Sequence, residues 1–556
     1  MKKLLWITAG VLSLASLAWV QVNRAVAPAL SSLMPAGPLI YLEAKDFHSL
    51  LNEWNNSGVK KVWLASANYQ VFSNSNLEQK LEGLYREYGA VAGFMPGLPG
   101  VLEIAGSESA LGLYDLREQQ FVYITRIGES QLAKSQLWRL RDKFTTRQAS
   151  GITFYLRRDD ALKRTVAFAF TDDFLVLATR DDLMANTLAL IARQNAQSLA
   201  GEPWFTAAAA QAGNAGELRM ALNMTSLIAD VHFRSYWIQR NISELRPFNA
   251  EIVDLTRGAR EIAESRILIR EPEREIPLPA NAALDSMAAL RVLAPATAGL
   301  ARAWAAPSPD MVESLIESKL LNPATAASMN PEYAPEAAST GESAGSEQDL
   351  EIRIDEPALP ADTSGVPRTA ALKQFITRAA PDALLSIQST SNAGAFVRTP
   401  CVLVISSQLD WEAAPVREAL ASVGVEWQRL PSGQLNTLGS LLFAIEGRRL
   451  FLANDSALLL ATLNRRGIAP LPRGPAYAAE FHAARERANY LKIMRALDFG
   501  GHAQSFLENP QGIRTPSFFS ENLGSLSSVF SFVESMLVTR VEAPGAQTQR
   551  VVYSYP

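Results

Sequence analysis

The sequence predicts an α+β protein with two duplicated lobes, each a mainly antiparallel sheet with packed helices, behind an N-terminal transmembrane or signal segment. Three features predict this architecture: the chain length, an internal repeat and an apolar amino terminus. The chain has 556 residues, of which 48% are hydrophobic. A single core stops growing at about 250 to 300 residues, so we expect two large lobes.

The amino terminus has the pattern of an export signal. Lys2 and Lys3 precede an uncharged, apolar stretch from Leu4 to Val20, and a basic start before such a run is typical of targeting segments. The stretch is long for the core of a cleaved signal peptide, about 7 to 15 residues, and short for a spanning helix, about 17 to 25. Both readings therefore stay open.

The residues after this stretch bear on cleavage. Ala25 and Ala27 supply a pattern that signal peptidases accept, whereas Arg24 places a charge where cleavage regions are normally uncharged. We favour an uncleaved signal anchor over residues 1–24. The positive-inside rule keeps the two lysines in the cytoplasm. We therefore expect a single-pass inner-membrane protein with most of its chain in the periplasm, or a protein secreted to the periplasm if the segment is cleaved.

The internal repeat is clearest in two stretches that align without a gap, residues 167–183 and 442–458. In each, a short alternating strand meets a polar turn, Asp172-Asp173 in the first and Glu446-Gly447 in the second. A second strand follows, and a cluster of Asp, Ser, Thr or Asn then opens a helix. Each stretch predicts a hairpin that leads into a capped helix.

Two upstream pairs of segments extend the repeat. Residues 110–114 followed by 121–125 correspond to residues 392–396 followed by 401–405, and each pair is typical of a hairpin. A helix is expected before each pair. In the first copy, Leu77 to Tyr88 form an apolar face behind a capping box that begins at Ser75, and Leu372, Phe375 and Ile376 mark the weaker second copy.

These correspondences predict a domain duplication, with a first lobe near residues 36–275 and a second near 277–556. A charged, proline-punctuated segment, 270–277, separates them. Within the second lobe, residues 322–368 are dominated by Ala, Ser, Pro, Gly and Glu. Such a composition buries too little apolar surface to offset the entropy of ordering, so we expect a disordered acidic insertion there.

Charge and cysteine content exclude several classes of function. The formal net charge is -4, which gives no general attraction for a phosphate backbone, so nucleic acid is not an expected partner. No phosphate-binding glycine pattern is present. Cys401 is the only cysteine and opens an apolar run that predicts a buried strand, so we interpret it as a packed thiol and not as a nucleophile.

Three groups of residues have the types or spacing that a chemical site could use. Gly341 to Gly345 match the G-x-S-x-G pattern of hydrolases, but no strand or helix is expected beside them, so the match is read as coincidence. Asp172-Asp173 and Asp181-Asp182 resemble paired carboxylates, and a turn and a helix cap explain them better. The four histidines lack metal-ligand spacing; they are His48, His232, His482 and His502.

The sequence thus predicts no catalytic residue, no cofactor-binding residue, no metal ligand and no cofactor. The repeat, the amino-terminal segment and the start from Gly37 to Ala44 together resemble large exported bacterial envelope proteins classed only as a domain of unknown function. The likeness is one of hydrophobic pattern and transfers no functional residue. It implies an exported α+β protein.

Three functions compete. The first is a non-enzymatic, membrane-anchored binding or scaffolding protein of the cell envelope, with an envelope protein or a lipid as its partner. The second is a carrier or chaperone for a lipid or another hydrophobic ligand, because antiparallel sheets backed by helices can enclose apolar cavities. The third is a cryptic hydrolase, which would need a cleft where a buried carboxylate or histidine meets a nucleophile.

Overall fold

The computed structural model describes most of the chain after residue 27. The described residues are 28–74, 76–95, 97–194, 196–236, 245–271, 277–321, 370–393, 396–421, 427–429, 436–438, 441–465, 468–489 and 532–556. The predicted anchor, Ser75 of the predicted capping box, the predicted acidic insertion with its Gly341–Gly345 pattern, and His502 all lie outside these residues. Among the residues that are described, no helix is both long enough and apolar enough to cross a membrane.

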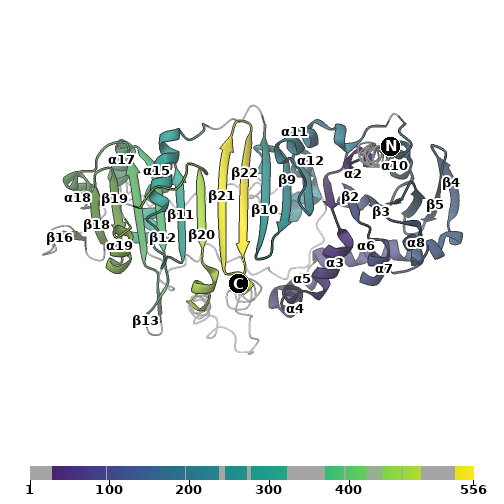
Figure 1. Ribbon diagram of the computed structural model, residues 1–556, viewed down its shortest axis with the longest axis horizontal. Coiled ribbons are helices and arrows are strands. Elements are labelled where there is room, and N and C mark those ends of the chain that lie inside the picture. The colour runs from purple at the N-terminus through teal and green to yellow at the C-terminus, as the bar shows by residue number, and fades with distance from the viewer. Residues whose placement is uncertain are drawn as a thin grey trace, which may run out of the picture. The chain divides into compact units, whose positions relative to one another are not determined.

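The chain divides into two compact units. The first comprises residues 1–60, 72–257 and 264–275, and the second comprises 61–71, 258–263 and 276–556, each as far as its residues are described. Each unit is built around one antiparallel sheet with helices (Figure 1). The predicted α+β class with mainly antiparallel sheets is therefore confirmed.

The sheet of the first unit has the neighbour order β10-β9-β8-β1-β2-β3-β7-β6-β5-β4. From β9 to β4 every neighbouring pair is antiparallel. The strands are β1 (Ile40–Ala44), β2 (Glu108–Asp115), β3 (Gln120–Arg126), β4 (Thr145–Ala149), β5 (Ile152–Asp159), β6 (Arg164–Thr171), β7 (Phe174–Ala178), β8 (Leu218–Asn223), β9 (Phe248–Arg257) and β10 (Glu261–Arg270).

Helices cover both faces of this sheet because its strands alternate apolar side chains to either side. In β6, Ala167 and Ala169 belong to one core cluster, whereas Phe168 belongs to another. Most helices lie between β1 and β2 or after β7. They are α2 (Leu30–Leu33), α3 (Phe47–Asn56), α6 (Asn76–Ala92), α7 (Leu98–Ile104), α8 (Glu129–Leu132), α9 (Gln136–Arg139), η1 (Arg141–Lys143), α10 (Asp181–Ile191), η2 (Leu199–Gly201), α11 (Pro203–Ala212), α12 (Met224–Ala229) and α13 (Val231–Tyr236). Most residues of α4 (Gly58–Leu64) and α5 (Ala67–Ser73) belong to the second unit.

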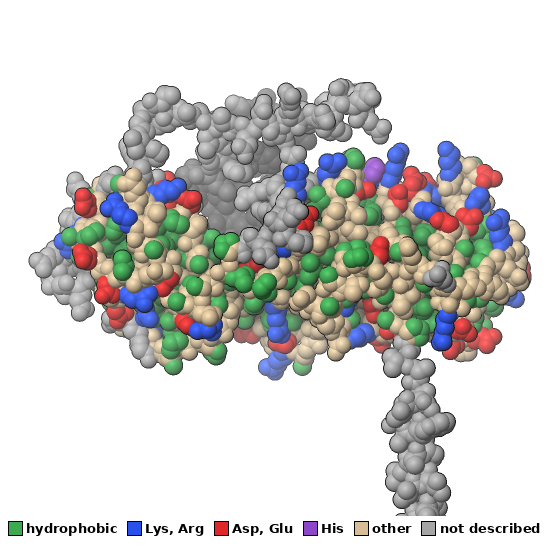
Figure 2. All heavy atoms as spheres, turned by 90° about the horizontal axis from the view of Figure 1, so that it is seen from above, with side chains coloured by type: hydrophobic (Ala, Val, Ile, Leu, Met, Phe, Trp, Pro, Cys, Tyr) green, Lys and Arg blue, Asp and Glu red, His purple; other side chains and the backbone are tan. Residues whose placement is uncertain are grey.

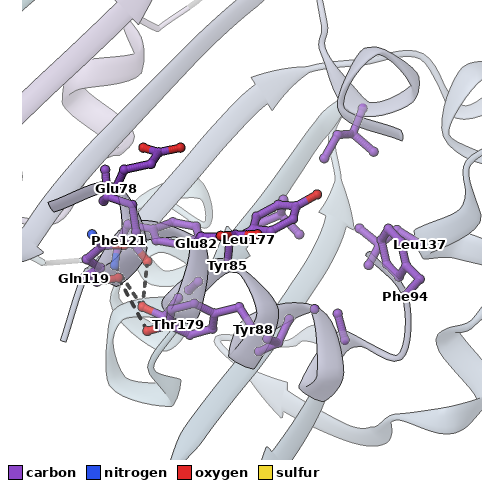
Figure 3. Close-up of a pocket in the computed structure, with 16 residues that line it drawn as sticks. Glu78, Glu82, Tyr85, Tyr88, Phe94, Gln119, Phe121, Leu137, Leu177 and Thr179 are labelled. Carbon is purple, nitrogen blue, oxygen red and sulfur yellow. Dashed lines mark hydrogen bonds between the residues drawn. The ribbon is translucent and has the colours of Figure 1, made fainter. Parts of the chain in front are cut away.

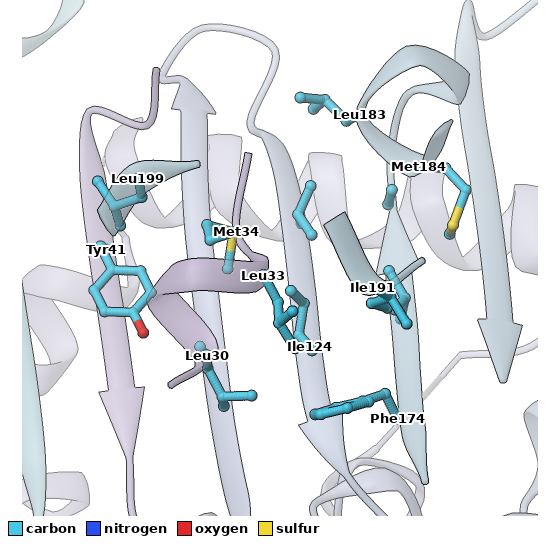
Figure 4. Packing of buried hydrophobic residues seen from close by; sticks show 14 of the residues in the cluster. Leu30, Leu33, Met34, Tyr41, Ile124, Phe174, Leu183, Met184, Ile191 and Leu199 are labelled. Atoms are coloured by element: carbon cyan, nitrogen blue, oxygen red, sulfur yellow. The ribbon is translucent and has the colours of Figure 1, made fainter. Parts of the chain in front are cut away.

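The larger core of the first unit lies under α2, α10 and α11. Figure 4 shows Leu30 and Met34 from the start of the unit packed over the strands near Tyr41 and Ile124. Leu30, Met34, Tyr41 and Ile124 are fully buried. The chain directly after the predicted anchor is therefore part of the fold of this unit.

The sheet of the second unit has the neighbour order β22-β21-β20-β11-β12-β15-β19-β18-β17-β16, and every pair is antiparallel. The strands are β11 (Leu300–Ala305), β12 (Pro381–Gln388), β15 (Cys401–Ser407), β16 (Trp427–Arg429), β17 (Asn436–Leu438), β18 (Leu441–Glu446), β19 (Arg449–Ala453), β20 (Tyr477–Phe481), β21 (Ser535–Ala543) and β22 (Ala546–Ser554). β13 (Ser391–Ala393) and β14 (Phe396–Arg398) form a separate two-stranded hairpin.

Helices again contribute to a core on each face of the second sheet. Residues of α15 (Asn281–Arg291) and α19 (Ser456–Leu463) enter one cluster. Residues of α16 (Pro309–Ile316), the π-helical turn η4 (Glu317–Leu321), α17 (Ala370–Ala379) and α18 (Ala413–Ala421) enter the other. Most side chains of this second cluster are large and aliphatic or aromatic, and β12, β15, β18 and β19 also contribute residues to it.

The structure confirms the two predicted hairpins with their following helices, β6-β7-α10 and β18-β19-α19. The prediction that residues 392–396 form the strand paired with 401–405 is wrong. That partner is β12, whose residues Asp382 to Ile387 are all buried. Both faces of β12 are covered, so its sequence lacks the alternation that marks a half-exposed strand.

Candidate functional site

The candidate site is an apolar groove in the first unit, between α6 and the sheet. Its volume is about 590 Å³. Side chains from α6, β3, β6 and β7 line it, and Figure 3 draws them as sticks. We call this space the α6 groove.

One face of α6 forms a wall of the groove. Leu81, Tyr85, Tyr88 and Ala92 recur at spacings of four, three and four, which places them on one side of a helix. Leu81 is 36% exposed and Tyr85 is 42% exposed. Leu84 of the same helix is buried, so α6 has one apolar stripe that packs against the protein and another that borders the groove.

The sheet forms the floor. Phe121 of β3, Val166 of β6 and Leu177 of β7 line the groove. At one end, Phe94 and Leu137 close it (Figure 3); Leu137 belongs to the smaller core cluster of this unit, and Phe94 packs against that cluster. The apolar end of the groove is therefore continuous with packed core.

The opposite end is polar. Glu78, Gln119 and Thr179 lie together there (Figure 3). Thr179 directly follows β7 and is fixed against β3, because the backbone N–H of Phe121 donates to its hydroxyl at 2.8 Å and its own N–H donates to the Phe121 carbonyl at 3.1 Å. Glu82, whose side chain is 55% exposed, adds a second carboxylate to the lining.

Arg164 ties α6 to the β2-β3 turn beside the groove. Its Nε donates to Glu87 of α6 at 2.8 Å, and its Nη1 donates to the Glu118 carboxylate at 2.6 Å. The guanidinium lies 5.4 Å from the centre of the Tyr88 ring, and the Tyr88 hydroxyl donates to the Glu118 carbonyl at 2.9 Å. Burial raises the pKa of Tyr88, so its phenol stays a neutral hydrogen-bond donor at physiological pH.

The residues that the sequence singled out do not converge. Among the described residues no three of His, Cys, Asp and Glu form a metal-ligand group. His48 lies on α3 and His232 on α13, whereas His482 follows β20, with its Nε2 3.3 Å from a Glu480 oxygen. Cys401 is buried in β15 as expected, and burial raises the pKa of its thiol to about 11.

The paired carboxylates have structural roles. Asp172 and Asp173 form the β6-β7 turn with φ of 48° and 63°, the left-handed conformation of tight hairpin turns. The prediction that Asp181-Asp182 cap a helix is wrong, because Arg180 occupies the N-cap position of α10 and its side chain makes no cap bond. Asp181 and Asp182 stand instead in the first turn, where a negative charge suits the helix dipole.

A buried polar cluster lies elsewhere in the first unit. The Tyr41 hydroxyl donates to Glu43 at 2.9 Å, and burial raises the pKa of that carboxyl. Arg219 makes two bonds to Asp254, at 2.8 and 2.7 Å. These four residues lie on neighbouring strands β1, β8 and β9, and none of them lines the α6 groove. We interpret the cluster as structural.

The surface charge gives no single binding face in the view of Figure 2. Basic and acidic side chains of the described residues are interspersed there with hydrophobic ones. The groove is therefore the candidate site. Sequence reasoning identified the apolar face of its helix, but nothing in that pattern distinguishes a packed face from one that borders a cavity.

Comparisons with known proteins found little. No protein-family model matches the chain, and no curated protein matches it. Among solved structures, crystal form III of TP0453 matches with a TM-score of 0.25 and 11% identity, over 47% of this chain and 87% of that one. Crystal form I matches with a TM-score of 0.25 and 12% identity, over 45% and 82%. At these scores the likeness supports no inference.

Proposed function

We propose that this chain is an exported, membrane-anchored envelope protein whose first unit binds a hydrophobic ligand in the α6 groove and carries or shields it. The α6 groove is the observation that carries the proposal. Its volume of about 590 Å³ falls within the range of ligand sites, roughly 300 to 1,000 Å³. An apolar lining with a few polar groups at one end is also usual for such sites.

The exposure of the lining supports the same proposal. Leu81 and Tyr85 of α6 remain partly exposed beside the cavity. Removing apolar surface from water is favourable by about 25 cal/mol per Å². A ligand that covers these side chains gains this stabilisation without any rearrangement of the sheet.

We also propose that the two units arose by duplication. Their strand neighbours support this, because β1 to β10 in chain order occupy the same sheet positions as β11, β12 and β15 to β22. The β13-β14 hairpin is then an addition between two strands of the second unit.

The location in the envelope rests on the sequence of residues 1–24. The basic start and the apolar stretch support export, and Arg24 favours retention as an anchor. A binding unit held at a membrane surface is well placed to receive an apolar molecule from lipid.

Native mass spectrometry of the full chain, gently extracted from its own membranes, tests the binding proposal. We expect one bound hydrophobic molecule per chain. Ala92→Trp, which fills the groove, should remove it, whereas Leu162→Trp, at an exposed position in the β5-β6 turn, should retain it. A wild-type chain without a bound molecule, or with a defined protein partner instead, would contradict the carrier and favour the scaffold. The same spectrum shows whether the chain starts at Met1.

A further inference from the structure

We infer that the α6 groove holds one unbranched hydrocarbon chain of up to about 17 carbons along the axis of α6, and so selects single-chain lipids over lipids with two chains. This ligand class rests on the proposed function and narrows it. It follows from the length, the width and the closed end of the groove.

The groove follows one face of α6. Its lining begins at Glu78, near the start of the helix, and reaches Ala92, the last residue of the helix. At about 1.5 Å for each residue, these two positions lie about 21 Å apart along the helix axis. An extended polypeptide advances about 3.5 Å over the three bonds of a residue, so an extended hydrocarbon chain advances about 1.2 Å for each bond. A chain of about 17 carbons therefore spans the groove from one end to the other.

The groove is wide enough for one such chain. A volume of about 590 Å³ over this length gives a mean cross-section of about 28 Å². Hydrocarbon chains in contact lie about 4.5 Å apart, so one chain takes about 20 Å² and two side by side take about 40 Å². A second chain would have to push α6 away from the sheet. The buried Leu84 and the bond from Arg164 to Glu87 oppose that movement.

Packed side chains close one end of the groove. Phe94 and Leu137 lie there (Figure 3). Leu137 is 3% exposed and belongs to the same core cluster as Phe144 and Phe168, whose ring centres lie 5.1 Å apart in an edge-to-face contact. Forcing extra methylene groups into a packed core is destabilising. A longer chain must therefore leave its extra methylene groups in water at the opposite end.

The charged groups near the groove favour no particular head. Glu82 already forms an ion pair with Arg86 on the exposed side of α6. Near the other end lies the guanidinium of Arg157, and a Cβ added to Gly93 would lie 2.8 Å from its Nη1. Charges of both signs are therefore close to the groove, and the discrimination between ligands lies in the hydrocarbon chain.

A mixture of chain lengths tests this selection. The full chain is held in a non-ionic amphipol and offered saturated 1-monoacylglycerols, from decanoyl to docosanoyl, with dipalmitoylglycerol at the same concentration. Native mass spectrometry reads which of them are bound. The amphipol is itself apolar, so a methylene group that enters the groove gains little, whereas each one left in water lowers the occupancy about fourfold. We expect similar occupancy up to about 17 carbons, a fall beyond that length, and no bound diacylglycerol.

Two variants at the closed end should move the length limit in opposite directions. Phe94→Ala should admit chains about three carbons longer, because removing a large side chain leaves a cavity. Ala92→Leu adds bulk to the lining and should shorten the limit by about as much. Leu162→Ala, at an exposed position in the β5-β6 turn, is the matched control for Phe94→Ala and should leave the limit unchanged. Either closed-end variant tests the limit if the other does not fold.

The outcomes separate this selection from the proposed function. If no length limit is found, or if the diacylglycerol binds as well, and Ala92→Trp abolishes binding, the groove binds apolar molecules but does not select a single chain. A limit that neither closed-end variant moves would also contradict the selection. If none of the lipids binds, or if binding is insensitive to Ala92→Trp, the proposed function itself fails.

Discussion

The helix-covered faces of the two sheets differ in how completely they are filled. In the first unit, Leu81 and Tyr85 of α6 are 36% and 42% exposed beside the cavity. In the second unit, Leu372 and Ile376 of α17 are 2% and 1% exposed and pack into a continuous core. The two sheets have ten strands each in the same neighbour order, yet the first borders an open groove and the second a closed core.

The covering side chains account for the difference. In the second unit Trp411 packs with its ring centre 5.6 Å from that of Phe375, and its indole N–H donates to the Arg448 carbonyl at 3.1 Å. In the first unit the α6 position Ala92, which lines the groove, carries only a methyl group. Large anchored side chains close the face of the second sheet, whereas the small side chain of Ala92 leaves room in the first unit.

The largest expected difference is in stability. Ile376→Ala should lower the free energy of unfolding of its unit by about 2 to 5 kcal/mol, because it leaves a cavity in a packed core. Leu81→Ala should cost less than about 1 kcal/mol, because that side chain is already partly in water. Urea unfolding followed by tryptophan fluorescence measures both. Equal losses would mean that the groove is closed in solution.

A cysteine placed in the α6 groove should react with iodoacetamide about a hundredfold faster than Cys401 in the core of the second unit. Cys401 lies in the closed core of the second unit, and burial raises the pKa of its thiol to about 11, so little thiolate forms at pH 8. A Leu177→Cys variant places a second thiol in the groove. Iodoacetamide labelling read by peptide mass spectrometry should modify the new cysteine first. Faster labelling of Cys401 would contradict the comparison.

A smaller effect is expected at the link between α6 and the β2-β3 turn. Arg164→Met removes the bonds to Glu87 and Glu118 and should cost about 1 to 2 kcal/mol. Hydrogen exchange should rise in α6 and leave α17 unchanged. Arg147→Met, at an exposed residue 4.0 Å from Asp181, is the control. Unchanged exchange in α6 would show that the helix is held by its buried stripe alone.

The sequence predicted those parts of the fold that local pattern determines. The β6-β7 hairpin follows from alternation around Asp172-Asp173, and α19 follows from Asp455, whose side chain accepts from the Leu458 N–H. β12 was missed because a strand buried on both faces does not alternate. The groove was missed because its depth depends on how α6 packs, which residue spacing does not specify.

A crystal structure of the full chain with 12-bromododecylamine tests the central claim most directly, because the bromine marks the end of the tail. We expect an anomalous bromine peak inside the α6 groove beside Phe94 and Leu137. A groove closed by α6 against the sheet, or a bromine peak only elsewhere on the protein, would contradict the claim that this groove is a binding site.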